Sequence, residues 1–251
     1  MQGLLSQRQT HLIGILNGID TQDRNPATDI ALIKPYSAKN ITEKKLVKKH
    51  LQKTFVLNID ASAPLLGVVS RFAYQKGLDL LPPIIPKLVA EGCQIAILGS
   101  GKKALEISFG RLHKQYPGMV SLNVGYNELL SHNIMAGADM LIMPSRFEPC
   151  GLNQLCDLTY GTPPIVSSTG GLADSIQHTS PASIKNNTAT GFVLKSVTQA
   201  TLLDTIREAT SLWKDKKAWR KIQKNGMGTY VSWASSATTC LDLYKKVIAQ
   251  Q

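Results

Sequence analysis

The sequence predicts an α/β protein built on a doubly wound parallel sheet. Short and almost continuous apolar runs alternate with longer segments of helical period between residues 64 and 194. Fully apolar strands are typical of a parallel sheet that helices cover on both faces. Glycine, proline and serine separate the runs, as expected for strand-to-helix loops. The hydrophobic share of 43% over 251 residues is ordinary for a globular domain with a sizeable core.

The expected elements follow one another in order along the chain. Six strands are predicted at residues 65–70, 94–98, 120–124, 139–143, 164–167 and 191–194. The helices between them are predicted at residues 78–90, from the Gly99-Ser100-Gly101 turn to residue 114, and at residues 127–136 and 151–160. Pro82-Pro83 must lie near the first turn of the first of these helices, because proline is tolerated only there.

The two ends of the chain differ from this central region. Residues 1–60 are irregular except for a lysine-rich helix from Thr42 to Phe55, which Thr42 is expected to cap. The chain is helical from Thr198 onward, and no strand follows its last helical segment. We therefore divide the chain into three segments, residues 1–60, 61–230 and 231–251.

The net charge of +11 raises the question of a nucleic-acid partner. Nine Lys and Arg against five Asp and Glu lie in residues 1–60, and six against one lie in residues 211–224. No aromatic residues alternate with these cations in the manner of single-strand binders. The favoured interpretation is two solvated helix faces, and neither nucleic acid nor a membrane is an expected partner. These faces comprise Lys44, Lys45, Lys48, Lys49 and Lys53, and then Lys214, Lys216, Lys217, Arg220, Lys221 and Lys224.

The cysteines and the N-terminus indicate a cytoplasmic protein. Cys93, Cys150, Cys156 and Cys240 lack metal-type spacing, and Cys93 and Cys240 are expected to be buried thiols. There is no run of about 18 apolar residues and no secretory signal at the start of the chain. A plastid location would apply to a plant protein, although no transit peptide is visible.

Basic residues follow the first predicted strand. Ligands of doubly wound sheets bind at the carboxyl ends of the strands, where loops enter helices. Arg71 and Lys76 are five residues apart on such a loop and can converge on one diphosphate. The alternative is that both are ordinary exposed residues of a surface loop.

Three further loops lie on the same rim of the predicted sheet. Glu148 precedes a predicted helix, where it would accept hydroxyl groups or, alternatively, only stabilise the helix dipole. The amides from Gly151 onward would donate to hydroxyl or phosphate groups. The Gly99-Ser100-Gly101 turn leads into a helix but lacks the full dinucleotide fingerprint, so by itself it is most simply a tight turn. The Gly170-Gly171 pair lets backbone amides approach an anion closely. Together the four loops predict a pocket for a phosphorylated sugar.

Several runs resemble bacterial glycogen synthases and plant starch synthases. The resemblance covers essentially the whole chain, and its central motifs are specific for that family. They are ILNGID and NPATD at residues 15–20 and 25–29, VVSRFAYQKGLDLL at 68–81, SRFEPCGLNQL at 145–155, YGT at 160–162, STGGLADSI at 168–176 and VSWASSATTCLDLY at 231–244.

This resemblance implies the C-terminal, Rossmann-like and donor-binding half of a GT-B glycosyltransferase. Residues 1–60 would hold the interdomain segment, residues 61–230 the nucleotide-sugar-binding domain and residues 231–251 the crossover helix. The family transfers glucose from ADP-glucose to the non-reducing end of an α-1,4-glucan with retention of configuration. ADP-glucose or ADP and the glucan would therefore be the ligands, although the preference for ADP-glucose over UDP-glucose stays open.

The resemblance also implies roles for individual residues. Arg71 and Lys76 would neutralise the leaving diphosphate, in place of a metal ion or any other cofactor, and Glu148 would contact the glucosyl group. Tyr126 would lie against the adenine. The amides of Cys150, Gly151 and Leu152 would hold the sugar hydroxyls, and Thr169, Gly170 and Gly171 would line the diphosphate.

The sequence departs from the family pattern at several positions. Arg24 stands where a tryptophan is expected, and Ser168 where an arginine is expected. The acceptor-side domain with its Lys-x-Gly-Gly loop has no counterpart in these residues. A separate chain that supplies this N-terminal half is therefore an expected partner. The alternatives are a non-catalytic nucleotide-sugar-binding remnant or excised domain, and a basic interaction protein on a Rossmann scaffold.

Overall fold

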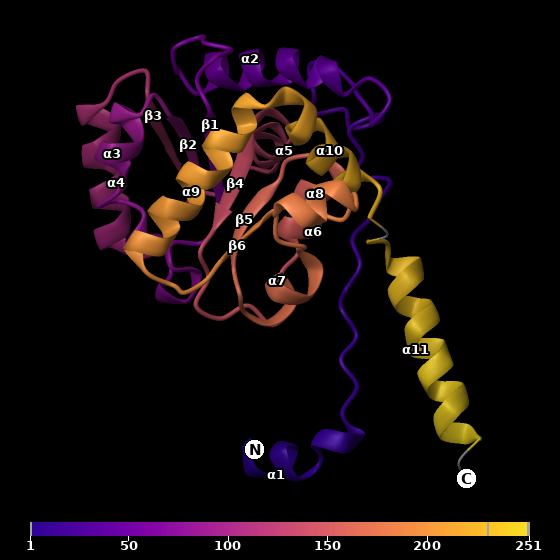
Figure 1. Ribbon diagram of the computed structural model, residues 1–251. Coiled ribbons are helices and arrows are strands. Elements are labelled where there is room, and N and C mark those ends of the chain that lie inside the picture. The colour runs from indigo at the N-terminus through magenta and orange to yellow at the C-terminus, as the bar shows by residue number, and fades with distance from the viewer. Residues whose placement is uncertain (1, 230, 250–251) are drawn as a thin grey trace.

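The protein has a six-stranded parallel sheet with the strand order β3-β2-β1-β4-β5-β6, as the computed structural model shows (Figure 1). The structure describes residues 2–229 and 231–249; Met1, Tyr230, Gln250 and Gln251 of the three predicted segments lie outside these residues. The order reverses between β1 and β4, so the topological switch point lies there. The doubly wound α/β class is confirmed. The strands are β1 (Leu65–Val69), β2 (Gln94–Gly99), β3 (Val120–Val124), β4 (Met140–Met143), β5 (Pro164–Ser167) and β6 (Phe192–Leu194).

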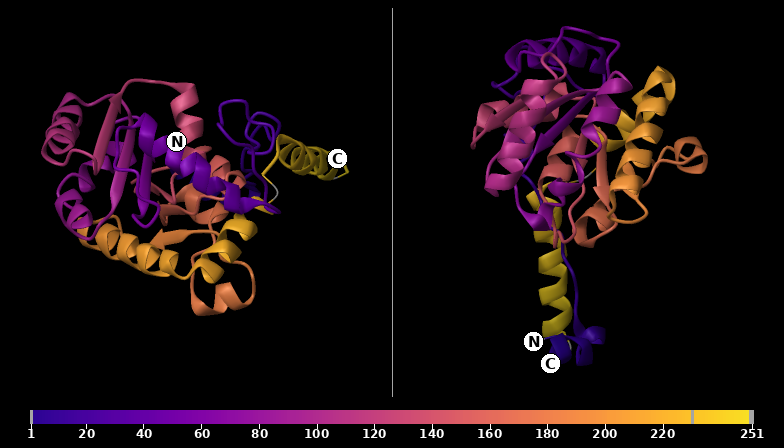
Figure 2. Two further views of the ribbon diagram at one scale, coloured as in Figure 1. Left: turned by 90° about the horizontal axis from the view of Figure 1, so that it is seen from above. Right: turned by 90° about the vertical axis from the view of Figure 1, so that its left-hand side faces the viewer.

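Helices connect the strands and cover both faces of the sheet (Figure 2). Short 3-10 turns at residues 9–11, 41–43, 74–76 and 78–80 complete the connections. The helices are α1 (Gln2–Gln7), α2 (Lys44–Thr54), α3 (Ile85–Ala90), α4 (Lys103–Gln115), α5 (Glu128–Gly137), α6 (Asn153–Thr159), α7 (Gly170–Ser175), α8 (Pro181–Lys185), α9 (Gln199–Lys214), α10 (Lys216–Met227) and α11 (Trp233–Ile248).

Three predicted helix starts are wrong. The Pro82-Pro83 pair interrupts the segment from Leu78, so α3 begins only at Ile85. Gly151 has a φ of 74°, outside the helical region, and α6 begins at Asn153. Thr42 lies inside a 3-10 turn and makes no side-chain hydrogen bond to cap α2.

The core follows the alternation of side chains along the buried strands. Leu66 and Val68 of β1 pack with residues of α3, α4 and α9 on one face of the sheet. Leu65 packs on the other face with Leu51 of α2 and Ile134 of α5. Because both sides of each central strand are covered, the strands are apolar throughout, as the sequence indicated.

Two lysines of α2 correct the prediction of a solvated face. Lys44 and Lys48 are each only 6% exposed. The Lys44 ammonium donates to the carbonyls of Ala136 and Tyr160 and to the Thr162 hydroxyl. Burial lowers the pKa of Lys44 to about 7. The other cations of the two predicted faces are exposed, as expected.

The cysteines match the prediction only in part. All four are free thiols. Cys93 and Cys156 are buried, and burial raises the pKa of these thiols to about 11 and about 12. Cys240 is half-buried, contrary to the expectation, because α11 packs no residue into the core.

The terminal segments extend away from the body on one side (Figures 1 and 2). The chain before α2 runs along the start of α11, where the Ile19 amide donates to the Val231 carbonyl at 2.8 Å and the Ser236 hydroxyl to the Leu16 carbonyl at 2.8 Å. Large apolar residues of α11 remain exposed, among them Leu241 and Tyr244. None of the helices in the described residues is long and apolar enough to cross a membrane.

Candidate functional site

The two loops that flank the switch point are bound to each other. The Arg146 amide donates to the Gln75 carbonyl at 2.8 Å, and the Gln75 side chain donates to the Phe147 carbonyl at 2.9 Å. Gly77 has a φ of 65°, and a Cβ atom there would lie 1.9 Å from the Pro144 carbonyl oxygen. Only glycine allows this approach, which brings residue 76 next to residue 148.

Lys76 and Glu148 form an ion pair where these two loops meet. Glu148 is 7% exposed, and the Ser145 hydroxyl lies 3.4 Å from its carboxylate. Glu148 precedes the first residue of α6 by five positions, so it is not a first-turn residue of that helix. The alternative of a helix-dipole role is therefore wrong, and this carboxylate is held by a cation from the neighbouring loop.

Arg71 is an exposed cation between two cavities. Its neighbour Phe72 is buried, and the Phe72 amide donates to the Ser100 carbonyl at 2.7 Å, so the backbone of this loop is fixed. Within the described residues Arg71 makes no ion pair. Its guanidinium is thus available to an external anion.

The small rim cavity has a volume of about 220 Å³ and lies at the Lys76–Glu148 pair. Arg71, Gly151 and Leu152 also line it. No hydrogen bond within the described residues engages the amides of Gly151 and Leu152, which precede α6. The cavity therefore offers cations, one carboxylate and free amides, the groups that a phosphorylated sugar requires.

The large rim cavity has a volume of about 510 Å³ and shares Arg71 and Leu152 with the small one. Tyr126 lines it and is 86% exposed. The Tyr126 hydroxyl donates to Glu128, and Arg24 pairs with the same carboxylate. Arg24, a departure from the family pattern, is thus part of the wall of this cavity.

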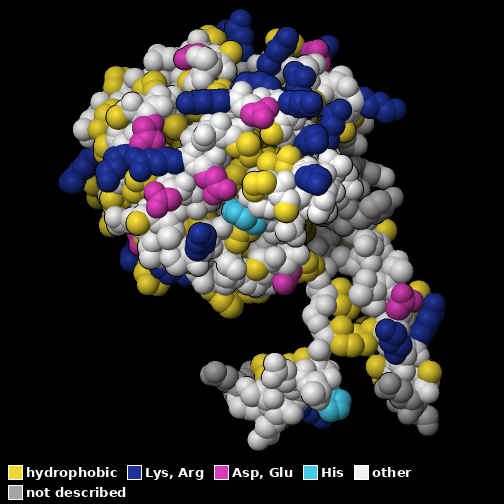
Figure 3. All heavy atoms as spheres, in the orientation of Figure 1, with side chains coloured by type: hydrophobic (Ala, Val, Ile, Leu, Met, Phe, Trp, Pro, Cys, Tyr) yellow, Lys and Arg dark blue, Asp and Glu magenta, His cyan; other side chains and the backbone are white. Residues whose placement is uncertain are grey.

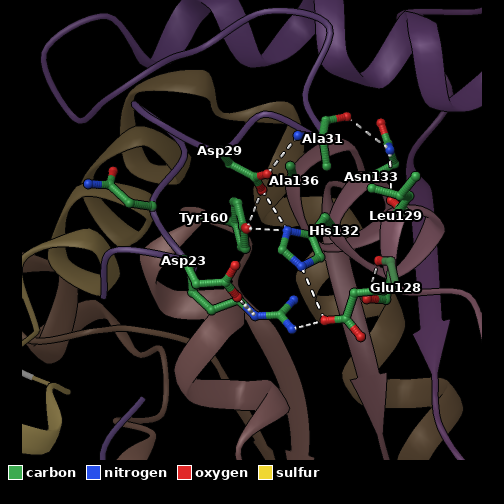
Figure 4. A network of polar contacts seen from close by, with 12 residues as sticks. Asp23, Asp29, Ala31, Glu128, Leu129, His132, Asn133, Ala136 and Tyr160 are labelled. Atoms are coloured by element: carbon green, nitrogen blue, oxygen red, sulfur yellow. Dashed lines mark hydrogen bonds and ion pairs between the residues drawn. The ribbon is translucent and has the colours of Figure 1, made fainter. Parts of the chain in front are cut away.

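A buried polar network supports this wall (Figure 4). His132 of α5 lies with its Nδ1 2.7 Å from Asp29, and the Tyr160 hydroxyl donates to the same carboxylate at 2.5 Å. Burial alone would raise the pKa of Asp29, but the hydrogen bonds from Tyr160 and His132 lower it below the ordinary value. Within the described residues no three His, Cys, Asp or Glu side chains are arranged to hold a metal ion.

The glycine pair at the start of α7 packs against the Glu148 loop. Thr169, Gly170 and Gly171 line neither rim cavity. The Gly171 amide donates to the carbonyls of Glu148 and Pro149 at 3.1 Å each, so it is not free to bind an anion. A Cβ atom on Gly171 would lie 2.1 Å from the Cys150 carbonyl oxygen. The start of α7 therefore stabilises the Glu148 loop through its backbone, on the side away from the rim cavities.

Cys150 also lies outside both rim cavities. Its thiol accepts the Asn17 amide at 3.4 Å, and its carbonyl accepts the Gln154 side chain at 2.9 Å. The structure thus brings Arg71, Lys76, Glu148, Gly151 and Leu152 together around the small cavity, with Tyr126 in the adjoining large one.

Sequence reasoning missed two ion pairs near the site. Arg146 donates to Asp79 at 2.6 and 2.8 Å and lies 3.9 Å from the ring centroid of Tyr74, which fixes the Glu148 loop. Glu128 with Arg24 is the other pair. The sequence feature that could have pointed to Glu128 is its position in the first turn of α5, directly after the Asn127 cap.

Residues 50–226 match the family described as "Glycosyl transferases group 1". The "Glycogen synthase" of Dechloromonas aromatica (strain RCB) is 45% identical over 246 residues, 98% of this chain and 51% of the relative. "Glycogen synthase 2" of Bradyrhizobium diazoefficiens is 46% identical over 246 residues, 98% of this chain and 50% of the relative.

The catalytic domain of Starch Synthase IV from Arabidopsis thaliana, bound to ADP and acarbose, has a similar structure. The TM-score is 0.90 at 34% identity, over 98% of this chain and 51% of that chain. This chain thus spans about half the length of the relatives it matches, and its fold is that of one Rossmann-like half of a GT-B glycosyltransferase. Since the family match extends over most of the chain, the protein belongs to the glycosyl transferases of group 1.

Proposed function

We propose that this chain is the donor-binding half of an ADP-glucose-dependent glycogen or starch synthase. In this proposal the enzyme transfers glucose to the non-reducing end of an α-1,4-glucan with retention. The observation that carries the proposal is the position of Arg71 between two joined cavities, with the Lys76–Glu148 pair in the smaller one. The large cavity would hold the nucleoside, with Tyr126 against the adenine, and the small one the glucosyl group.

The chemistry of the step follows from the charges. When the glycosidic bond to the diphosphate breaks, negative charge develops on the leaving oxygen, and a cation there lowers the barrier. Arg71 and Lys76 would supply this charge. Glu148, once its lysine turns to the phosphate, would accept sugar hydroxyls opposite the amides of Gly151 and Leu152.

For Thr169 and the glycine pair at the start of α7 we propose a supporting role. Thr169, Gly170 and Gly171 would keep the Glu148 loop in place, because the Gly171 amide is bound to that loop. Cys150 would contribute its backbone amide only, since its thiol contacts Asn17. The free thiols also fit a reducing compartment such as the cytoplasm.

Catalysis would require a second Rossmann-like half. Tyr126 is 86% exposed and Arg71 is also exposed, so the described residues leave the donor accessible to water. Transferases need a closed site in which acceptor and donor are held in line. We propose that an N-terminal half closes the site and binds the glucan.

Isothermal titration with ADP tests the donor site. Arg71→Ala and Lys76→Ala should each weaken ADP binding by at least about tenfold, because each removes a charge-assisted contact. Arg111→Ala, an exposed arginine of α4, is the matched control and should leave ADP affinity unchanged. Equal affinities in all variants would refute the proposed site.

Glucose incorporation into glycogen separates the enzyme from a non-catalytic module. The chain is assayed alone and mixed with an N-terminal domain of the family. Incorporation in the mixture only supports a two-half enzyme. ADP binding without incorporation in either sample supports a module that binds the nucleotide sugar and does not catalyse.

A further inference from the structure

A basic groove lies between α2 and α10, at the end of the sheet opposite the rim cavities. It has a volume of about 480 Å³. Ala61 and Asp139 line it and precede β1 and β4, which places it at the amino ends of these strands. Figure 3 shows Lys and Arg side chains gathered over this part of the surface. The cations in its lining are Lys44, Lys45, Lys48, Lys49, Lys216 and Arg220.

Two lysines of the groove lie close to the indole ring of Trp213. The ammonium groups of Lys48 and Lys216 lie 4.8 and 3.1 Å from the ring centroid of Trp213. Asp139, the one carboxylate in the lining, is 2.7 Å from Lys48 and also accepts the Leu65 amide at 2.8 Å. Asp139 neutralises one of the six cations in the lining, so the groove keeps a net positive charge.

Lys216 feels both burial and its charged neighbours. Burial, the largest cause, lowers the pKa of Lys216, the charge of Asp139 opposes this shift, and the nearby charge of Lys48 adds to it. An anion bound beside these two ammonium groups would relieve their repulsion. The free energy of such relief is larger here than on open surface, because the groove excludes part of the water.

Further cations at the edge of the groove are free to bind. Lys45, Lys49 and Arg220 are exposed, and none of them makes an ion pair within residues 2–229 and 231–249. Trp213 and Trp219 are only 6% and 3% exposed, so neither offers a face on which a nucleic-acid base could stack. The volume of the groove, about 480 Å³, is also that of a small-molecule site.

We propose that the basic groove is a second ligand site, which binds a small phosphorylated anion carrying at least two negative charges. The phosphate groups would lie between Lys216 and the exposed cations Lys49 and Arg220. The exposed apolar side chains of Leu46 and Ile59 would contact the organic part of the ligand. The site is independent of the donor site, since the two share no residue.

Tryptophan fluorescence tests this site with inorganic pyrophosphate as the probe. The chain has three tryptophans, and Trp233 lines the large rim cavity, so Trp233→Phe leaves only the two indoles of the basic groove as reporters. A saturable change in emission with a Kd below about 1 mM is expected in this background. The affinity should fall with salt, as for other multiply charged anions.

Two double variants with the same change in charge decide the outcome. Lys49→Gln with Arg220→Gln should weaken pyrophosphate binding by at least about tenfold. Lys221→Gln with Lys224→Gln alters exposed lysines of α10 outside the lining and should leave the affinity unchanged. Equal weakening in both, or a change that never saturates, would overturn the proposal. So would binding of a short oligothymidine in a sample where pyrophosphate produces no change.

Discussion

The Lys48–Asp139 and Lys76–Glu148 ion pairs lie at opposite ends of the sheet and differ in their hydrogen bonds to the backbone. Lys48 donates to Asp139 and to the Ala63 carbonyl, both at 2.7 Å, and Asp139 accepts the Leu65 amide as well. Within the described residues the side chains of Lys76 and Glu148 make no hydrogen bond to backbone, and the pair lines the small rim cavity.

The difference distinguishes a structural pair from one that is available to a ligand. Backbone hydrogen bonds at Ala63 and Leu65 tie the Lys48–Asp139 pair to the start of β1, although both residues also line the basic groove. A pair with spare donors and acceptors beside a cavity can exchange partners when a phosphate and a sugar enter.

The largest expected effect is the loss of stability when the Lys48–Asp139 pair is broken. Lys48→Met should lower the free energy of unfolding by about 3 kcal/mol, because it removes the cation of Asp139 and also the donor to the Ala63 carbonyl. Lys76→Met should lower it by less, because within the described residues the Lys76 ammonium bonds to Glu148 and to no backbone carbonyl. Urea denaturation measures both, and equal losses would remove the distinction between the pairs.

A smaller effect is expected where the polar network supports the large rim cavity. Tyr160→Phe removes a hydrogen bond to the buried Asp29 and should cost about 1–2 kcal/mol. Because the pKa of Asp29 is lowered in the folded state, its contribution is present above the unfolded value of 3.8 and is lost as the pH falls through the folded value. Urea unfolding across the acid range should show this loss in the unaltered chain and a weaker pH dependence in the variant. An unchanged pH dependence would contradict the account of the network.

A gain in stability is expected at Asp157, a fully buried carboxyl whose two oxygens have no hydrogen-bond partner in the described residues. Burial raises the pKa of Asp157 well above the ordinary value, despite the charge of Lys44. The folded state therefore retains a proton that the unfolded chain releases, and stability falls as the pH rises above 3.8.

Asp157→Asn should accordingly stabilise the chain by about 1–2 kcal/mol near about pH 8, with the gain fading toward acid pH. Thermal unfolding at several pH values measures it. Asp174→Asn, at an exposed position, is the control and should change little. A variant less stable than the unaltered chain at alkaline pH would show that Asp157 is ionised and bound usefully to Lys44.

The smallest effect on stability is expected at the rim, with a large effect on the ligand. Glu148→Gln keeps the shape of the side chain but removes the charge opposite Lys76, and it should change the free energy of unfolding by about 1 kcal/mol. It should weaken ADP-glucose binding and leave ADP binding intact, because Glu148 would contact the glucosyl group only. Titration with the two nucleotides checks this, and a parallel loss for both would place Glu148 on the phosphates.

The sheet and the Arg71 and Glu148 loops could be predicted because their signals are local. Each apolar run forms one strand, and ligands of such sheets bind after the strands. The burial of Lys44 and Lys48 depends on partners such as Thr162 and Asp139, which are 118 and 91 residues away. Their spacing of four, on the same face as Val47 and Leu51, was a signal that charge alone obscured.

The glycine turn shows the same limit. A pair of glycines predicts a close approach but does not say to what. Gly170 and Gly171 approach the backbone of residues 148–150, a contact between the start of α7 and the Glu148 loop that no local pattern encodes. The function of the turn could therefore be inferred only after the loops had been placed side by side.

The most direct test of the account is a crystal structure of this chain with ADP-glucose. We expect the diphosphate between Arg71 and Lys76, the adenine in the large rim cavity against Tyr126, and the glucosyl group in the small rim cavity beside Glu148. A nucleotide bound in the basic groove, or at the rim without contact to Arg71 and Lys76, would contradict the assignment of the donor site.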